Sequence, residues 1–163
     1  MSAPSPHPLL DALRAGGIGR DVAAADVPTR LGDAARRLPG ADPGVAELLA
    51  QLVSAPGALH WALVGDGLAM PHVRLPVPLG RDLGVLAILL LREPLAVPEE
   101  PPDGRPVRCL LFFVAPTPKA HLEMISQLSS HLVHGCLKQL LAAGAPDAEI
   151  EAALAAPTPG RAQ

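Results

Sequence analysis

The sequence predicts a single α/β layered domain. A continuous apolar run at residues 83–91 and a second, strongly apolar segment at 107–115 are typical of strands buried on both faces. Segments with apolar residues at helical spacing precede and follow these runs, so helices and strands alternate. The 163 residues suffice for one domain with its own core. We expect that domain at 8–156, between a flexible lead at 1–7 and a polar tail at 157–163.

The amino-terminal part is predicted to be mainly helical. Residues 8–14 have the length of one or two helical turns, which a pair of glycines ends. A short edge strand is expected at 18–22. The next helix covers 26–38, with Asp26 or Thr29 as its N-cap, because apolar side chains recur there at i, i+3, i+4 and i+7.

A further helix is expected to begin at Pro43, with Asp42 as its N-cap, and to run to about Val53. Its core-facing stripe is predicted from the larger apolar residues at helical spacing, which are Val45, Leu48, Leu49 and Leu52.

The middle of the chain is predicted to be mainly extended. Short apolar segments at 61–64 and 68–70 flank a Gly-Asp-Gly turn. Pro76 and Pro78 keep the following segment out of regular structure. Repeated prolines then predict a loop at 92–106, between the two buried strands.

Helices are predicted to complete the domain. Thr117 and Pro118 are an N-cap and first helical position, and the helix that they open runs to about His134. Shorter helices are expected at 136–143 and 147–155. The inward face of the long helix is predicted to consist of Leu122, Ile125, Leu128, Ser129 and Leu132.

The composition excludes several classes of function. Aromatic residues make up 2% of the chain and its net charge is −3, so neither stacking platforms nor a basic surface for nucleic acid is expected. The longest apolar runs fall short of the ~20 residues of a membrane-spanning helix. The first residues also lack the charged start and apolar core of a signal peptide. We therefore expect a cytoplasmic protein that does not insert into membranes.

His72 is the first candidate for chemistry. Pro71 fixes its own φ and favours an extended conformation for Met70, so the imidazole of His72 follows a stiff backbone. Gly65 and Gly67 allow a tight turn shortly before it. A neutral imidazole nitrogen can act as a nucleophile when its tautomer is fixed.

Two blocks of sequence resemble a known family. Val-Gly-Asp-Gly-Leu-Ala-Met-Pro-His at 64–72 resembles the active-site signature of the EIIA domains of the phosphoenolpyruvate-dependent sugar phosphotransferase system, in the mannitol–fructose class and particularly its nitrogen-regulatory branch. The segment 103–122, from Asp-Gly-Arg-Pro-Val to Ala-His-Leu, is similar to the second signature of that family. The blocks stand in the family's order, and the resemblance covers roughly residues 8–155.

The resemblance implies a fold and a phosphohistidine chemistry. It implies a mixed β-sheet sandwiched between helices, and phosphorylation of His72 by the phosphocarrier HPr or its nitrogen-branch counterpart. It also implies that His121 lies beside the acceptor and helps to hold the phosphate. In the first turn of a helix, His121 would meet the positive end of the helix macrodipole, which favours an anion. Asp66 is either an orienting residue for an imidazole or a turn residue.

Other polar residues are weaker candidates. Arg74 and Lys119 could contact phosphate or simply be solvated. His131 and His134 are spaced as a metal-binding pair, but without an evident third ligand we expect solvated side chains, no metal site and no cofactor. No role is predicted for His7 or His60.

One position departs from the family. Where many members have an arginine that contributes to the site, this chain has Pro56. Phosphorylation could then be slow, could rely on Arg74 or Lys119 instead, or could be lost in a chain that only binds partners. With the acceptor intact and no membrane domain within these residues, we expect a regulatory phosphocarrier. The alternatives are a transport EIIA acting with an EIIB subunit, or a non-phosphorylatable interaction module.

Overall fold

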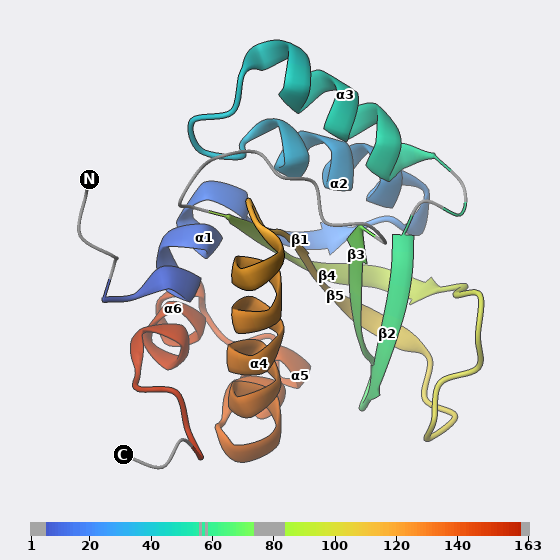
Figure 1. Ribbon diagram of the computed structural model, residues 1–163. Coiled ribbons are helices and arrows are strands. Elements are labelled where there is room, and N and C mark those ends of the chain that lie inside the picture. Colours follow the sequence, from blue (N-terminus) through green and yellow to red (C-terminus); the bar gives the residue numbers. More distant parts are fainter. Residues whose placement is uncertain (1–5, 56, 58, 74–83, 161–163) are drawn as a thin grey trace.

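The computed structural model describes residues 6–55, 57, 59–73 and 84–160, and it has the expected mixed sheet between helices (Figure 1). The sheet is five-stranded, in the order β1-β4-β5-β3-β2. The β1–β4 and β3–β5 pairs are parallel, whereas β4–β5 and β2–β3 are antiparallel. The strands are β1 (Gly17–Val22), β2 (Leu59–Gly65), β3 (Leu68–Val73), β4 (Val85–Leu95) and β5 (Val107–Val114).

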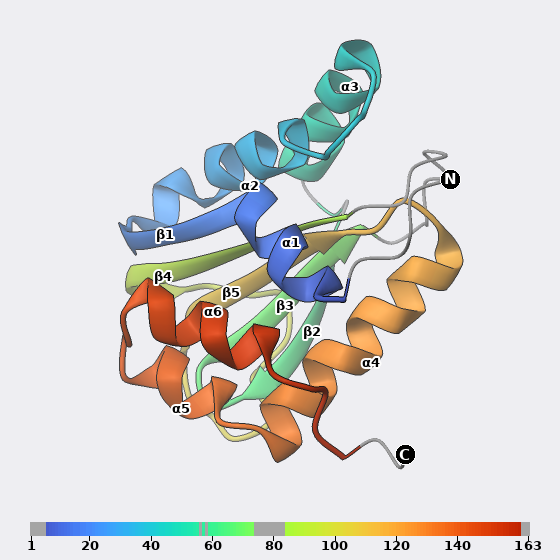
Figure 2. The same cartoon turned by 90° about the vertical axis from the view of Figure 1, so that its left-hand side faces the viewer.

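Helices cover both faces of this sheet. Figure 2 shows α2 and α3 on one side and α4, α5 and α6 on the other. The helices are α1 (Pro8–Gly16), α2 (Val27–Arg36), α3 (Pro43–Ser54), α4 (Pro118–His134), α5 (Leu137–Ala142) and α6 (Asp147–Ala155), with a 3₁₀ turn at Ala24–Asp26. Among the described helices, none is long and apolar enough to cross a membrane.

Each face of the sheet has its own buried core. Side chains of α1, α4, α5 and α6 pack on one face, around residues such as Leu86, Leu111 and Leu128. Side chains of α2 and α3 pack on the other face, around residues such as Leu31 and Phe112. Because β4 and β5 lie inside the sheet and are covered on both sides there, residues 85–89 of β4 and 109–114 of β5 are all apolar and buried.

The predicted apolar stripe of α3 is wrong. Leu49 is buried, but Val45, Leu48 and Leu52 are 38%, 68% and 43% exposed. The buried face consists instead of Ala46, Leu49, Ala50 and Val53. Small side chains let α3 approach α2 closely, so the buried face is rotated away from the largest residues.

Smaller differences concern helix caps and element ends. Asp42 caps α3 by accepting a hydrogen bond from the Gly44 amide at 2.8 Å, as predicted. Asp26 occupies the corresponding position of α2, but its side chain makes no capping hydrogen bond. On α4, Leu122 is 68% exposed, and the predicted inward face shifts to Met124, Leu128, His131 and Leu132. Strand β4 continues to Leu95, into the predicted loop. The predicted irregular segment at Pro76 and Pro78 lies outside the described residues.

Candidate functional site

A tight hairpin sets the position of the candidate acceptor. Gly65, Asp66 and Gly67 connect β2 to β3 with φ angles of 90°, 54° and 79°. Glycine adopts positive φ without steric cost, and aspartate is among the few other residues that tolerate it. From this turn β3 runs between β2 and β5 to His72, which pairs with His60 of β2 and Phe113 of β5.

The imidazole of His72 is held in one tautomer. Its Nδ1 lies 3.0 Å from the carbonyl oxygen of Met70. Since a carbonyl oxygen can only accept, Nδ1 carries the proton and donates it. The ring is 8% exposed and stacks on Phe113, with centroids 5.4 Å apart and planes 21° apart. Nε2 therefore carries the lone pair and is the nitrogen available to attack an electrophile.

The structure brings His121 to His72, as expected. His121 lies in the first turn of α4, whose N-cap Thr117 accepts a hydrogen bond from the Ala120 amide at 3.1 Å. The centroids of the two imidazoles are 5.3 Å apart in an edge-to-face arrangement. The ring of His121 also lies 5.2 Å from that of Phe113. The end of β3 and the start of α4 thus place two imidazoles over one phenyl ring.

A third histidine, His60, for which the sequence predicts no role, lies beside this pair. The centroid of the His60 ring is 5.0 Å from that of His72, again in an edge-to-face arrangement. The signal was present in the sequence, because His60 and His72 are equidistant from Asp66 at the centre of the hairpin turn. In a symmetric hairpin, such residues are cross-strand partners on the same face of the sheet.

Burial keeps the acceptor neutral. Desolvation lowers the pKa of His72, against the opposing effect of the Met70 hydrogen bond, and positive charge on His121 or His60 lowers it further. Desolvation also lowers the pKa of His121. At neutral pH His72 is therefore an unprotonated imidazole, the form that can act as a nucleophile.

Asp66, in contrast, is not brought to His72. Strand β3 separates them, and the stretch from Leu68 to His72 alone spans roughly 13 Å at about 3.3 Å per residue. The Asp66 carboxylate forms ion pairs with Arg105 at 2.9 Å and with Lys138 at 3.0 Å. The geometry therefore places Asp66 in the turn, as one of the two sequence-based alternatives has it, and not beside the imidazole of His72 as an orienting residue.

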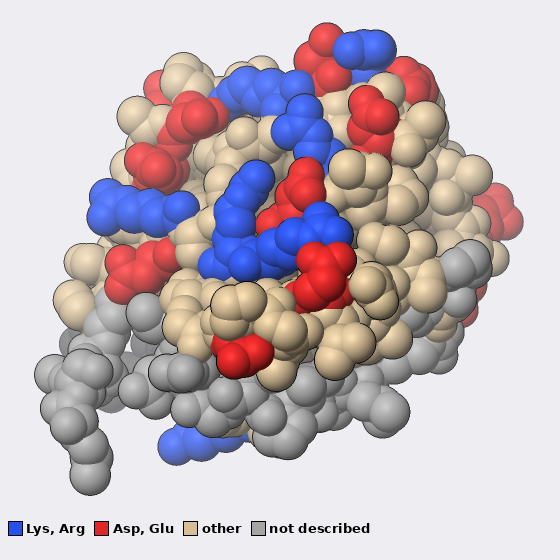
Figure 3. Space-filling view, turned by 90° about the horizontal axis from the view of Figure 1, so that it is seen from above, with Lys and Arg blue, Asp and Glu red and all other residues tan. Residues whose placement is uncertain are grey.

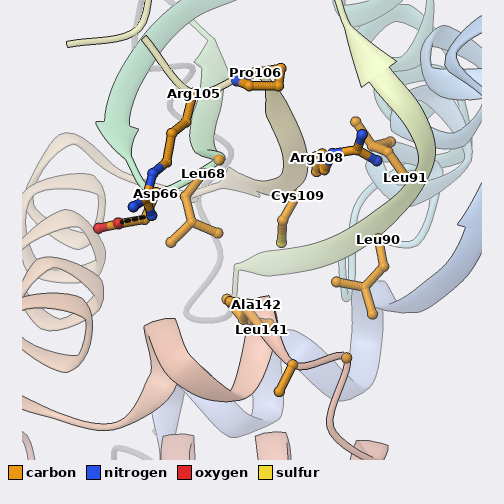
Figure 4. Close-up of a pocket in the computed structure, with 13 residues that line it drawn as sticks. Asp66, Leu68, Leu90, Leu91, Arg105, Pro106, Arg108, Cys109, Leu141 and Ala142 are labelled. Carbon is orange, nitrogen blue, oxygen red and sulfur yellow. Dashed lines mark hydrogen bonds and ion pairs between the residues drawn. The ribbon is translucent and has the colours of Figure 1, made fainter. Parts of the chain in front are cut away.

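The same end of the sheet has a pocket of about 490 Å³. Figure 4 shows Arg105 paired with Asp66 at one side of this pocket, with Leu68 and Cys109 nearby. Burial raises the pKa of the Cys109 thiol to about 12, so this cysteine is unreactive. Since Leu68 and Cys109 are register partners, as are His72 and Phe113, the pocket and the histidines lie at opposite ends of the β3–β5 pair.

The remaining candidates are scattered. Lys119 is exposed in the first turn of α4, whereas Arg74 and Pro56 lie outside the described residues. His134 is exposed, but His131 is 3% exposed and thus not solvated as predicted. Within the described chain, no group of three or more His, Cys, Asp or Glu side chains could hold a metal ion.

Charges of both signs are interspersed on the face formed by α2 and α3. Figure 3 shows Lys and Arg side chains beside Asp and Glu side chains across this face. Arg36, for example, pairs with Asp33 at 3.0 Å and with Glu47 at 2.9 Å. The visible surface thus has no field of one sign of the kind that a nucleic-acid backbone would require.

Comparison with known proteins identifies a family for this chain. The model of the family described as the phosphoenolpyruvate-dependent sugar phosphotransferase system, EIIA 2, matches residues 44–155, which include all three clustered histidines. Comparison with the sequences of curated proteins gives no match.

Several solved structures are similar in fold, and two of them illustrate the likeness. The nitrogen regulatory protein IIA-Ntr from Neisseria meningitidis is 22% identical, with a TM-score of 0.60 over 90% of this chain and 98% of its own. IIA mannitol from Escherichia coli is 20% identical, with a TM-score of 0.53 over 86% of this chain and 96% of its own.

Proposed function

The chain belongs to the EIIA 2 family of the phosphoenolpyruvate-dependent sugar phosphotransferase system, and from this premise we propose that it is a cytoplasmic regulatory phosphocarrier that is phosphorylated on His72 by an HPr-type protein. One observation carries the proposal. The hydrogen bond from Nδ1 of His72 to the Met70 carbonyl leaves a fixed nucleophilic nitrogen, Nε2, on a ring that burial keeps neutral.

The proposed step moves only the phosphoryl group. The Nε2 lone pair of His72 forms a bond to phosphorus while the bond from phosphorus to the donor protein's histidine nitrogen breaks. The electron pair of the broken bond stays on that donor nitrogen. The proton stays on Nδ1 of His72, hydrogen-bonded to the Met70 carbonyl throughout, so no side chain of this site has to act as a base. Positioning and electrostatic stabilisation are then the whole task of the protein.

His121 is the proposed stabilising partner. Its ring lies beside that of His72, in the first turn of a helix of 17 residues. The helix macrodipole there favours an anion by ~0.3–1 kcal/mol at an exposed site. An imidazole N–H of His121 could also donate to a phosphoryl oxygen, and hydrogen bonds to charged groups are the stronger class.

The likeness to IIA-Ntr, a nitrogen regulatory protein by its name, favours the regulatory role. The likeness to IIA mannitol supports the alternative, in which the chain is the EIIA component of a sugar transporter. The two roles differ in the fate of the phosphoryl group. A transport component passes it to an EIIB subunit, whereas a regulator binds its target differently in the two phosphorylation states.

Reconstitution of the phosphoryl relay tests the proposal. The chain is incubated with phosphoenolpyruvate, enzyme I and an HPr-type protein, and acid-labile phosphate is then measured on the chain. We expect labelling of the wild type and none of the His72→Ala variant. An unlabelled wild type would indicate a chain that only binds partners, and equal labelling of the two proteins would show that the phosphate is not on His72. Either result would overturn the proposal.

Transfer of the phosphoryl group to an EIIB subunit would show that the chain is a transport component. Retention of the label, with binding to a target that differs between the phosphorylated chain and His72→Ala, would decide for regulation.

A further inference from the structure

We propose that His60 is a third phosphate-contacting residue, which donates an imidazole N–H to the phosphoryl group on Nε2 of His72. The inference rests on the proposed phosphorylation of His72. It concerns a residue that lies outside both sequence blocks of the active-site signatures.

The hairpin register places His60 at the acceptor. His60 and His72 are cross-strand partners in the antiparallel β2–β3 pair, so both side chains project from the same face of the sheet. Their ring centroids are 5.0 Å apart, which is as close as the 5.3 Å between His72 and His121. The acceptor ring therefore has an imidazole on β2 and another on α4 as its neighbours.

Because His60 is exposed, its side chain is free to turn towards a phosphoryl group on His72. The His72 ring is 8% exposed, and its inner edge faces the Met70 carbonyl. A group bonded to Nε2 therefore projects away from the strand backbone. His60 is exposed on the edge strand β2 and can rotate its side chain towards such a group. It needs no rearrangement of the buried core to do so.

The negative charge of the phosphorylated site can be stabilised by a hydrogen-bond donor such as His60. A phosphoryl group on nitrogen brings negative charge to a site whose ring neighbours in the described structure are His60, His121 and the apolar Phe113. The Arg105 and Lys138 side chains are paired with Asp66 at the other end of β3. Of the neighbouring rings, those of the two histidines can donate hydrogen bonds to phosphoryl oxygens.

A small phosphoryl donor tests this role without a docking partner. The full chain is incubated with phosphoramidate, and phosphohistidine formation is followed by ³¹P NMR for the wild type, His60→Ala, His60→Gln and His60→Arg. Exposed His134 gives the matched control, His134→Ala, because it lies about 20 Å along α4 from His121 at about 1.5 Å per residue. Thermal unfolding of each variant checks that it is folded.

We expect His60→Ala to be labelled about tenfold more slowly than the wild type, since a hydrogen bond to a charged group is lost. His60→Arg should recover most of the rate, because guanidinium donates to phosphate oxygens. His134→Ala should behave as the wild type. In the wild type, the ring resonances of His60 should shift when His72 is phosphorylated, and those of His134 should not.

The outcomes separate the two proposals. If the wild type is labelled on His72 and His60→Ala is labelled within twofold of its rate, the role of His60 is overturned and the proposed function stands. Equal slowing in the Ala, Gln and Arg variants would also overturn it, because a structural role alone gives no rescue by a new cation. Should neither phosphoramidate nor the phosphoryl relay label His72, the proposed function fails and the role of His60 fails with it.

Discussion

The proposed acceptor, His72, depends on one backbone contact within its own strand. Because the Met70 carbonyl fixes the Nδ1 proton, the choice of nucleophilic nitrogen is made before any donor arrives. Phe113 supports the ring from β5, and burial keeps it unprotonated. The nucleophile is therefore ready for reaction in the unphosphorylated chain.

The residues of the site were predictable to different degrees. His72 and His121 could be named from two sequence blocks, and the structure brings them together. The position of His60 beside His72 can be predicted only from the pairing of β2 with β3 in the hairpin. Asp66 is close to His72 in sequence but not in space, because an extended strand has a rise of about 3.3 Å per residue.

Substitution of Asp66 tests its placement in the turn. Asp66→Asn keeps a residue that tolerates positive φ but loses both ion pairs, which are partly exposed and worth about 0–1 kcal/mol. We expect phosphorylation of His72 to stay within twofold of the wild-type rate, whereas His121→Ala should be at least about tenfold slower. Both rates are measured in the reconstituted relay. A large loss of rate in Asp66→Asn would contradict the separation of the turn from the site.

At the level of elements, α3 shows where sequence patterns reach their limit. Its start was predictable, because Asp42 and Pro43 act locally on the first turn. Its buried face was not, because that face depends on how closely α2 approaches. The helix has two neighbouring apolar faces, and both contain Leu49. Packing against α2 buries the face that contains alanines, and the local sequence pattern does not determine which face is buried.

A matched pair of neighbouring leucines tests the observed face of α3. Leu49 is 4% exposed and Leu48 is 68% exposed. Leu49→Ala should lower the free energy of unfolding by about 2–5 kcal/mol, since it leaves a cavity between helix and sheet. Leu48→Ala should change it by less than about 0.5 kcal/mol. Urea unfolding of both variants gives the values, and a reversed order would restore the predicted stripe.

For the whole molecule, the fold class could be predicted from the sequence, but the order of the strands could not. The two apolar segments at 83–91 and 107–115 predicted a sheet covered on both sides, and they form β4 and β5 inside the observed sheet. The order β1-β4-β5-β3-β2 depends on pairings between strands far apart in the chain. Such pairings follow from the packing of whole layers, and only the β2–β3 hairpin was encoded locally.

Stability of the whole chain should fall as the pH falls from about 7 to 5. Burial lowers the pKa values of His72, His121 and His131 in the folded state. The unfolded chain therefore takes up protons first, below the ordinary histidine pKa of about 6.5, and acid favours unfolding. Urea unfolding at several pH values measures the slope. His131→Gln should flatten it relative to the exposed control His134→Gln, and a stability that rises towards pH 5 would contradict the buried neutral histidines.

The central claim is that Nε2 of His72 carries the phosphoryl group. The most direct measurement is ³¹P and ¹⁵N NMR of the full chain after phosphorylation through phosphoenolpyruvate, enzyme I and an HPr-type protein. We expect one phosphohistidine, bonded through Nε2 of His72, with the proton retained on Nδ1 and still donated to the Met70 carbonyl. Phosphate on Nδ1, on another histidine, or on none would contradict it.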